Sequence, residues 1–202
     1  MTVRHIILSV FFVAFFAPVL ASAQSKAPDE LFKQGNDAFN EGQIDKAIEL
    51  YAQATVKRKD FKEAWYNLGI AYGRKKQFDK EISSYEKAIG IDAKYTKALY
   101  NIAIAHEDKG SDDKAIEYYE KVVEAEPERG VDARINAGIL YARKGQLEKA
   151  VESYKAAIKI DPNVADAHFN LGIAYSKQAA KVDDDTEKKK LWSAEADAYK
   201  AA

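Results

Sequence analysis

The sequence contains no cysteine, and only four prolines and ten glycines occur among its 202 residues. Without cysteine the chain cannot form disulfide bonds, and it cannot carry a lipid on a cysteine as exported lipoproteins do. Its stability must therefore come from packing alone. The prolines and glycines do not gather into a linker, so we expect one continuous folded array, residues 24–202, behind the leader described below.

An excess of charge of one sign is also missing. The chain has 31 basic and 32 acidic side chains, which gives a formal net charge of −1. This balance provides no electrostatic footprint for nucleic acid or for an anionic membrane surface, so neither is an expected partner.

Residues for catalysis are equally scarce. Outside the leader there are two histidines, no glycine-rich phosphate loop and no metal ligands at a recognised spacing. We therefore expect no enzyme activity, no metal and no cofactor. The acidic run 183–185 lacks the ligand geometry of a cation site, and we interpret it as the acidic start of a last helix.

The longest hydrophobic run lies at the N-terminus. Arg4 precedes the apolar residues 6–16, and Ala21-Ser22-Ala23 fits the small-x-small pattern that signal peptidase cleaves. We predict a cleavable signal peptide over residues 1–23, a mature chain beginning at Gln24, and a periplasmic or secreted location without stable membrane insertion. The alternative is a retained anchor, for which the run is slightly shorter than the ~20 apolar residues of a spanning helix.

What the sequence has in abundance is self-similarity. A small residue recurs every 34 or 35 residues, at Gly35, Gly69, Ala103, Gly138 and Gly172. Around one of them, Trp65, Leu68 and Tyr72 form one helical stripe, and a second stripe follows from Phe78 to Ile89. Each unit is thus predicted to be two short antiparallel helices, which bury their apolar faces only by stacking on neighbouring units.

These residues resemble the tetratricopeptide repeat family. The resemblance rests on Trp65, Leu68, Gly69 and Tyr72, on the alanines 47, 115 and 150, on the tyrosines 51, 85, 119 and 154, and on the closing prolines 127 and 162. It covers nearly the whole mature chain, with units at about 28–61, 62–95, 96–130, 131–164 and 165–202. It implies an all-α fold, a right-handed α-solenoid of about five helical hairpins, whose first helices line a concave and commonly peptide-binding groove.

The other face of each first helix supplies the candidate site. Asparagine stands two residues before most of the small residues, at Asn67, Asn101, Asn136 and Asn170. An asparagine side chain can accept from a backbone N–H and donate to a backbone C=O, so a row of them can hold an extended peptide. The row resembles the asparagine ladder of peptide-binding members of the family. The alternative is that these side chains only bond neighbouring helices.

Aromatic and basic residues complete the candidate groove. They are Tyr66, Tyr100, Phe169, Arg74, Arg143 and Lys177. A subclass of the family that clamps a peptide's C-terminal carboxylate is only partly matched. Asn36, Asn67 and Lys97 fit that subclass, whereas Phe32 and Asn101 stand where its basic residues belong.

Several positions depart from the repeat pattern. Glu81 replaces an alanine between the paired helices, and we expect it to lie at the edge of that interface and reach solvent. His106 replaces a tyrosine, and we expect a packed, hydrogen-bonded core histidine rather than a ligand. Arg134 and His168 begin first helices where other units have leucine or tryptophan, which predicts a more polar rim.

The last unit is longer than the others. Tyr199 lies 27 residues after Gly172, whereas Tyr85 lies 16 after Gly69. This predicts an insertion of roughly ten residues, as a long polar stretch through Asp185 before the second helix resumes with Leu191 and Trp192. No polar capping helix follows in this sequence. Leu191 and Trp192 are expected either to cover the C-terminal edge or to leave an apolar patch for a partner.

The sequence therefore predicts a non-enzymatic scaffold in the cell envelope that holds an extended peptide or protein segment of unknown identity in its groove. The alternative is a structural subunit that self-associates weakly, or docks through its C-terminal edge, in an envelope assembly.

Overall fold

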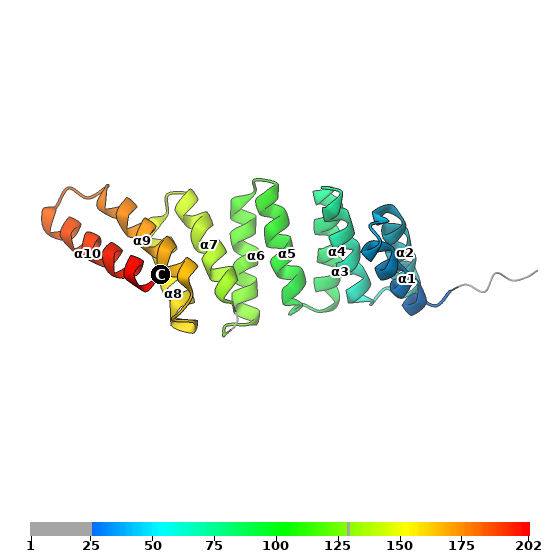
Figure 1. The fold of residues 1–202 in the computed structure, drawn as a ribbon. Coiled ribbons are helices and arrows are strands. Elements are labelled where there is room, and N and C mark those ends of the chain that lie inside the picture. Colours follow the sequence, from blue (N-terminus) through cyan, green and yellow to red (C-terminus); the bar gives the residue numbers. More distant parts are fainter. Residues whose placement is uncertain (1–25, 129) are drawn as a thin grey trace, which may run out of the picture.

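The structure, a computed structural model, describes residues 26–128 and 130–202, and within them the chain forms ten α-helices and no strand (Figure 1). The predicted signal peptide lies outside the described residues. The helices are α1 (Pro28–Asn40), α2 (Ile44–Lys57), α3 (Lys62–Arg74), α4 (Phe78–Ile91), α5 (Thr96–Asp108), α6 (Asp112–Ala125), α7 (Val131–Arg143), α8 (Leu147–Ile160), α9 (Ala165–Ala179) and α10 (Asp185–Ala201).

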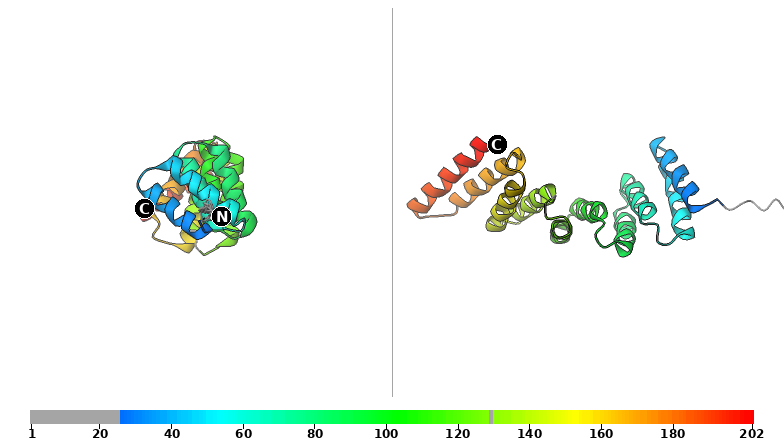
Figure 2. Two further views of the ribbon diagram at one scale, coloured as in Figure 1. Left: turned by 90° about the vertical axis from the view of Figure 1, so that its right-hand side faces the viewer. Right: turned by 90° about the horizontal axis from the view of Figure 1, so that it is seen from below.

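Consecutive helices pair into five antiparallel hairpins, and each hairpin packs on the next along the chain. The result is an elongated array, seen as a shallow arc in the right-hand view of Figure 2. The expected all-α solenoid is confirmed. Among the described residues, none of the helices combines the length and the apolar character needed to cross a membrane.

A small residue facing a tyrosine ring brings the two helices of a hairpin together. A Cβ atom added to Gly35, Gly69, Gly138 or Gly172 would lie only 2.5–2.6 Å from a ring carbon of Tyr51, Tyr85, Tyr154 or Tyr199, respectively. In the third hairpin, Ala103 and Tyr119 take these positions and are fully buried. The predicted seam is therefore present in every hairpin, including the last.

Tight turns close the first four hairpins. Three of these turns place a glycine, Gly42, Gly110 or Gly145, in the left-handed backbone region at φ between 72° and 76°. Glycine adopts this conformation without the steric cost that a Cβ atom causes. The second hairpin uses Lys76 at φ 56° instead, so that turn is strained.

Polar contacts tie each hairpin to the next. Three of them are ion pairs between a lysine just after a first helix and an aspartate at the start of the second helix in the preceding hairpin, namely Lys75 with Asp45, Lys109 with Asp79, and Lys144 with Asp113. At the last junction Gln178, near the end of α9, donates a hydrogen bond to Glu148 at 3.3 Å. Exposed pairs of this kind contribute at most about 1 kcal/mol each. They repeat with the period of the fold and favour one stacking register.

The last hairpin corrects one prediction. Only Ala180–Asp184 separates α9 from α10, so the long polar stretch through Asp185 is wrong. Most of the extra residues lie in the part of α10 before Tyr199, which stands fourteen positions after the first residue of the helix, compared with seven for Tyr85 in α4. Seven residues make nearly two full helical turns, so Tyr199 still points at Gly172.

The start of α10 agrees with its sequence pattern. The side chain of Asp184 accepts a hydrogen bond from the backbone N–H of Glu187 at 2.7 Å, and Asp185 and Glu187 lie in the first turn. The acidic run therefore caps a helix, as predicted.

Glu81 occupies an unusual niche between α3 and α4. It is partly exposed at the edge of the interface, as expected, but its carboxylate lies where a Cβ atom on Gly73 would come within 2.6 Å of it. The hydroxyl of Tyr85 donates to Oε1 at 3.5 Å. Burial, followed by the charge of Asp108, raises the pKa of Glu81 to about 7.

His106 is packed as predicted, but it is not fully hydrogen-bonded. Only 6% of its surface is exposed, and its ring stacks on Tyr118 with 5.7 Å between centroids. Its Nδ1 atom is buried and has no hydrogen-bond partner among the described residues, which contradicts that part of the expectation. Burial, followed by Lys114 and Lys109, lowers the pKa of this histidine.

Arg134 and His168 do more than make the rim polar. Nη2 of Arg134 donates to the carbonyl of Pro127 at 3.5 Å, and Nε2 of His168 lies 2.9 Å from the carbonyl of Pro162. Trp65 donates to the carbonyl of Lys59 in the same way, at 3.1 Å. Three different side chains thus fasten the loop that precedes their own helix.

Candidate peptide-binding face

The candidate face, defined by the asparagine row and the aromatic and basic residues predicted beside it, is carried by the first helices of the hairpins. The four asparagines of the row lie on α3, α5, α7 and α9, and each is partly exposed. One asparagine in each of the last four hairpins follows from the repeat period, and Lys33 takes this position in the first hairpin. The structure also shows what orients each of them.

Asn101 and Asn136 are held by tyrosines of the preceding hairpin. Nδ2 of Asn101 donates to the hydroxyl of Tyr66 at 3.1 Å, and Nδ2 of Asn136 donates to the hydroxyl of Tyr100 at 2.8 Å. Longer contacts of 3.5 and 3.4 Å reach the seam tyrosines Tyr85 and Tyr119. The amide planes are therefore fixed by contacts between hairpins.

The two outer asparagines, Asn67 and Asn170, have other partners. The residue equivalent to Tyr66 and Tyr100 is Phe32 in the first hairpin and Ile135 in the fourth. Neither side chain has a hydroxyl. Asn67 instead donates to Oδ1 of Asn36 at 2.8 Å. Asn170 donates to the carbonyl of Asp166, within its own helix, at 2.8 Å. Only the middle of the row is therefore anchored by tyrosine.

Bonding between helices, the alternative explanation of these asparagines, is thus present, but it leaves part of each amide unused. Among the described residues, Oδ1 of Asn101 and of Asn136 accepts no hydrogen bond. An amide oxygen offers two lone pairs, so each can accept from a peptide N–H. Asn36, by contrast, already accepts from Tyr51 and Asn67 through Oδ1, so its Oδ1 is not free in the way that those of Asn101 and Asn136 are.

The aromatic residues form the floor of the face. The ring of Tyr66 lies 5.6 Å from that of Tyr85 and 5.3 Å from that of Tyr95, and Tyr100 lies 5.5 Å from Tyr119. Burial raises the pKa of the Tyr66 and Tyr100 hydroxyls, so both stay protonated at neutral pH.

The ring of Phe169 packs against that of Tyr199, with 5.8 Å between the ring centroids, but Phe169 remains 53% exposed. It is therefore the most solvent-exposed of the three predicted aromatic residues, since Tyr66 and Tyr100 are only partly exposed.

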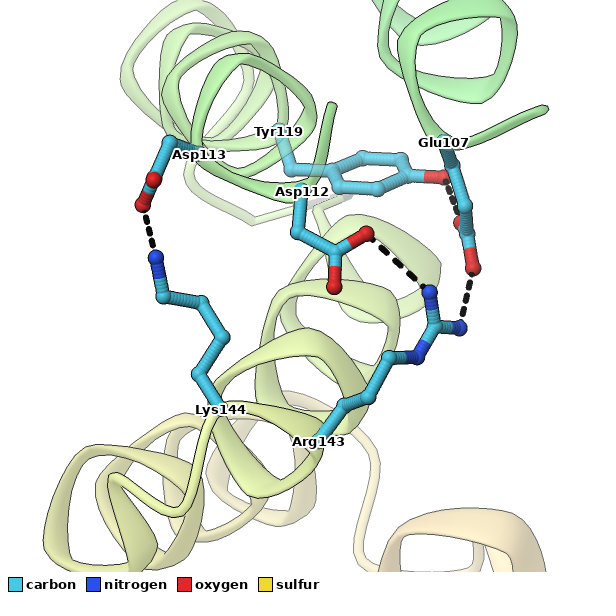
Figure 3. A network of polar contacts seen from close by, with 6 residues as sticks. All are labelled: Glu107, Asp112, Asp113, Tyr119, Arg143 and Lys144. Atoms are coloured by element: carbon cyan, nitrogen blue, oxygen red, sulfur yellow. Dashed lines mark hydrogen bonds and ion pairs between the residues drawn. The ribbon is translucent and has the colours of Figure 1, made fainter. Parts of the chain in front are cut away.

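The three basic residues are not equivalent. Figure 3 shows Arg143 between two carboxylates, 2.8 Å from Glu107 and 3.1 Å from Asp112. The same Glu107 accepts from the hydroxyl of Tyr119 at 3.5 Å, so Arg143 belongs to an internal network. Arg74 and Lys177 are exposed and form no ion pair among the described residues, although Arg74 lies 5.9 Å from the ring of Phe39.

A cavity of about 350 Å³ opens beside the first asparagine of the row. It is lined by Asn36, Phe39, Asn40, Tyr51, Asn67 and Ile70, and so lies between α1 and α3. Asn67 was predicted from the sequence as a groove residue, whereas Phe39 and Asn40 were not. Asn40 follows Gly35 by five residues, as Arg74 follows Gly69, and this shared offset is the signal that could have identified it.

A larger cavity of about 640 Å³ lies apart from the asparagine row, between the ends of α2 and α4. Its lining is Thr55, Val56, Lys59, Trp65, Glu86, Lys87, Gly90 and Ile91. Nothing in the repeat pattern predicted it. Val56 is 76% exposed there and provides a useful control position.

Comparison with known families decides the relationship. Models described as tetratricopeptide repeat match residues 32–96 and 96–129, and a model described as TPR repeat matches residues 138–178. The chain belongs to the tetratricopeptide repeat family. No curated protein matches it significantly in sequence.

Solved structures with the same fold include a crystal structure of MamA protein, 21% identical, with a TM-score of 0.71 over 86% of this chain and 92% of that one. A MamA structure from Desulfovibrio magneticus RS-1 is 18% identical, with a TM-score of 0.69 over 88% and 96%. YrrB, described as a TPR protein with an unusual peptide-binding site, is 20% identical, with a TM-score of 0.65 over 83% and 84%. At this identity the similarity establishes the fold.

Proposed function

We propose that this repeat protein is a non-enzymatic scaffold of the cell envelope that holds an extended peptide or protein segment along its first helices. The observation that carries the proposal is the asparagine pair Asn101 and Asn136, each oriented by a tyrosine hydroxyl and each with an unused oxygen. The signal-like N-terminus supports export, and the described peptide-binding site of YrrB supports this use of the fold.

The chemistry of the face suits a main chain better than a particular sequence. The free Oδ1 atoms accept from backbone N–H groups, while the Nδ2 groups are already directed at tyrosine hydroxyls. Because protonated tyrosine hydroxyls fix the amides beforehand, binding costs less side-chain entropy. Sequence preference then comes from the cavity beside Asn67, which accepts a side chain, and from the cations Arg74 and Lys177.

Site-specific photocrosslinking in intact cells tests where the partner lies. A photoreactive residue at Ile104, which is 38% exposed on α5, should capture the partner, whereas the same residue at the more exposed Val56 should not. Capture from Val56 alone would move the binding site to the opposite cavity and contradict the proposal.

A binding measurement tests the asparagines themselves. A synthetic peptide matching the captured segment should bind the double variant Asn101→Ala/Asn136→Ala at least about fivefold more weakly, since each lost polar pair is worth ~0.5–1.5 kcal/mol. Helicity should be unchanged, and Asn163→Ala, in the loop before α9, is the matched control. Unchanged affinity, or a collapse of the melting temperature, would assign both asparagines to packing.

A further inference from the structure

The tyrosine of the last hairpin differs from its four counterparts in exposure. Tyr51, Tyr85, Tyr119 and Tyr154 are at most 2% exposed, whereas Tyr199 is 40% exposed although it makes the same contact with its glycine. The four buried tyrosines are covered by a following hairpin. Among the described residues, α10 packs on α9 and has no following hairpin.

Two further aromatic side chains are exposed near Tyr199. Phe169 is 53% exposed and its ring lies 5.8 Å from that of Tyr199. Trp192 is also 53% exposed and precedes Tyr199 by seven residues, so both lie on one side of α10. We call Phe169, Trp192 and Tyr199 the C-terminal aromatic face. Since Trp192 is exposed, it does not cover this edge, and the alternative of an apolar patch holds. Exposed aromatic side chains of this kind mark interaction sites.

The opposite edge of the array is polar. In α3, Ala64, Leu68 and Ala71 are buried. The residues of α1 at the equivalent positions of the repeat are polar: Glu30, Gln34 and Asp37.

Gln34 donates to Glu30 at 3.0 Å and accepts from Lys26 at 2.7 Å, so these groups are satisfied on the surface. Stacking the C-terminal aromatic face on α1 of another copy would bury them without comparable partners. Head-to-tail association is therefore disfavoured.

The charges on α10 complement those of a second, antiparallel α10. Lys188 and Glu195 stand on either side of Trp192 along the helix, both are partly exposed, and neither forms an ion pair among the described residues. If two copies cross antiparallel near Trp192, Lys188 of one lies opposite Glu195 of the other. A two-fold axis makes this pair twice.

We propose that two copies of this chain associate through their C-terminal aromatic faces, with the two α10 helices antiparallel across a two-fold axis. The interface buries Phe169, Trp192 and Tyr199 of both copies and forms two Lys188–Glu195 pairs. Because each copy uses the same patch, the assembly closes as a dimer. It takes Phe169 away from the candidate peptide-binding face, whereas Asn101 and Asn136, on α5 and α7, are not part of the interface.

Sedimentation equilibrium of the purified protein from about 1 μM to about 500 μM tests the association. A monomer–dimer equilibrium is expected, and Trp192→Glu should raise the dissociation constant at least about tenfold. Val56→Glu, which changes an exposed apolar residue in the first hairpin, should leave it unchanged. Circular dichroism checks that both variants fold. A monomer at all concentrations, or a dimer insensitive to Trp192→Glu, would overturn the proposal.

Charge reversal tests the antiparallel arrangement. Lys188→Glu and Glu195→Lys should each weaken the dimer several-fold, and the double variant Lys188→Glu/Glu195→Lys should restore it. A mixture of the two single variants should form heterodimers more tightly than either variant associates with itself. Failure of both the double variant and the mixture to recover association would overturn the arrangement.

Discussion

The second and fourth hairpins, residues 62–91 and 131–160, share one seam but differ around it. Gly69 packs on Tyr85 as Gly138 packs on Tyr154. Beside this common contact, the second hairpin has Glu81 where the fourth has Ala150, and Lys76 at a left-handed position where the fourth has Gly145. The comparison shows that the seam defines the fold, while the surrounding positions tolerate polar and strained residues at a local cost.

The largest expected effect is on the seam itself. Gly69→Leu and Gly138→Leu should each destabilise the protein by about 3 kcal/mol or more, because even one added carbon lies within 2.6 Å of a buried tyrosine ring. Thermal melts should give similar losses for both variants. Two clearly different losses would show that the hairpins do not share one seam.

A smaller expected effect is a pH dependence of stability that comes from Glu81 in the second hairpin and has no counterpart at Ala150 in the fourth. The pKa of Glu81, about 7 in the fold, is raised above its unfolded value near 4.5, so the folded state binds the proton more tightly. The stability that this group contributes is present below pH 4.5 and is lost as pH rises through 7. Glu81→Gln should therefore stabilise the protein by about 1–2 kcal/mol at pH 8 and by little at pH 4.5. The gain at pH 8 is smaller than the full pKa difference would give, because Glu81 is partly exposed and solvent screens its charge.

Urea unfolding at the two pH values measures this difference. A control variant, Glu152→Gln in the fourth hairpin, replaces an exposed carboxylate of α8 and should change stability by similarly small amounts at the two pH values. An equal gain from Glu81→Gln at both pH values would remove the proton linkage assigned to this site.

Gly73 and Glu81 should prove energetically coupled. In the native chain, Gly73→Ala should change stability by less than about 1 kcal/mol, because the better helix former displaces the flexible end of Glu81. With Glu81→Ala already present, the same change should stabilise by up to about 1 kcal/mol. A double-mutant cycle measures the coupling, and strictly additive changes would contradict the niche described for Glu81.

The smallest expected effect concerns the strained turn. Lys76→Gly should stabilise the second hairpin by up to about 1 kcal/mol, since glycine tolerates φ 56° without the clash of a Cβ atom. The reverse change in the fourth hairpin, Gly145→Lys, should destabilise by a similar amount. If chemical unfolding ranks these two variants the other way, the turns do not differ as described.

Much of the fold was predictable because it depends on local periodicity. The 34-residue period, the helical stripes and the fixed distance from each small residue to its tyrosine identify paired helices without tertiary information. Tyr199 shows the limit of this approach. Its role was recoverable from its residue type, but only the structure shows that most of the additional residues form helix before Tyr199 in α10 rather than a loop.

The candidate face was predictable only in part. Sequence alone determined that one asparagine of the row lies on the first helix of each of the last four hairpins, because one helical residue in each repeat has a fixed orientation. Tertiary structure decided which amide meets a tyrosine hydroxyl, that Arg143 is occupied by Glu107 and Asp112, and that Tyr199 stays exposed. These outcomes depend on how one hairpin is rotated against the next, and that rotation brings together residues about 35 positions apart, beyond the reach of local periodicity.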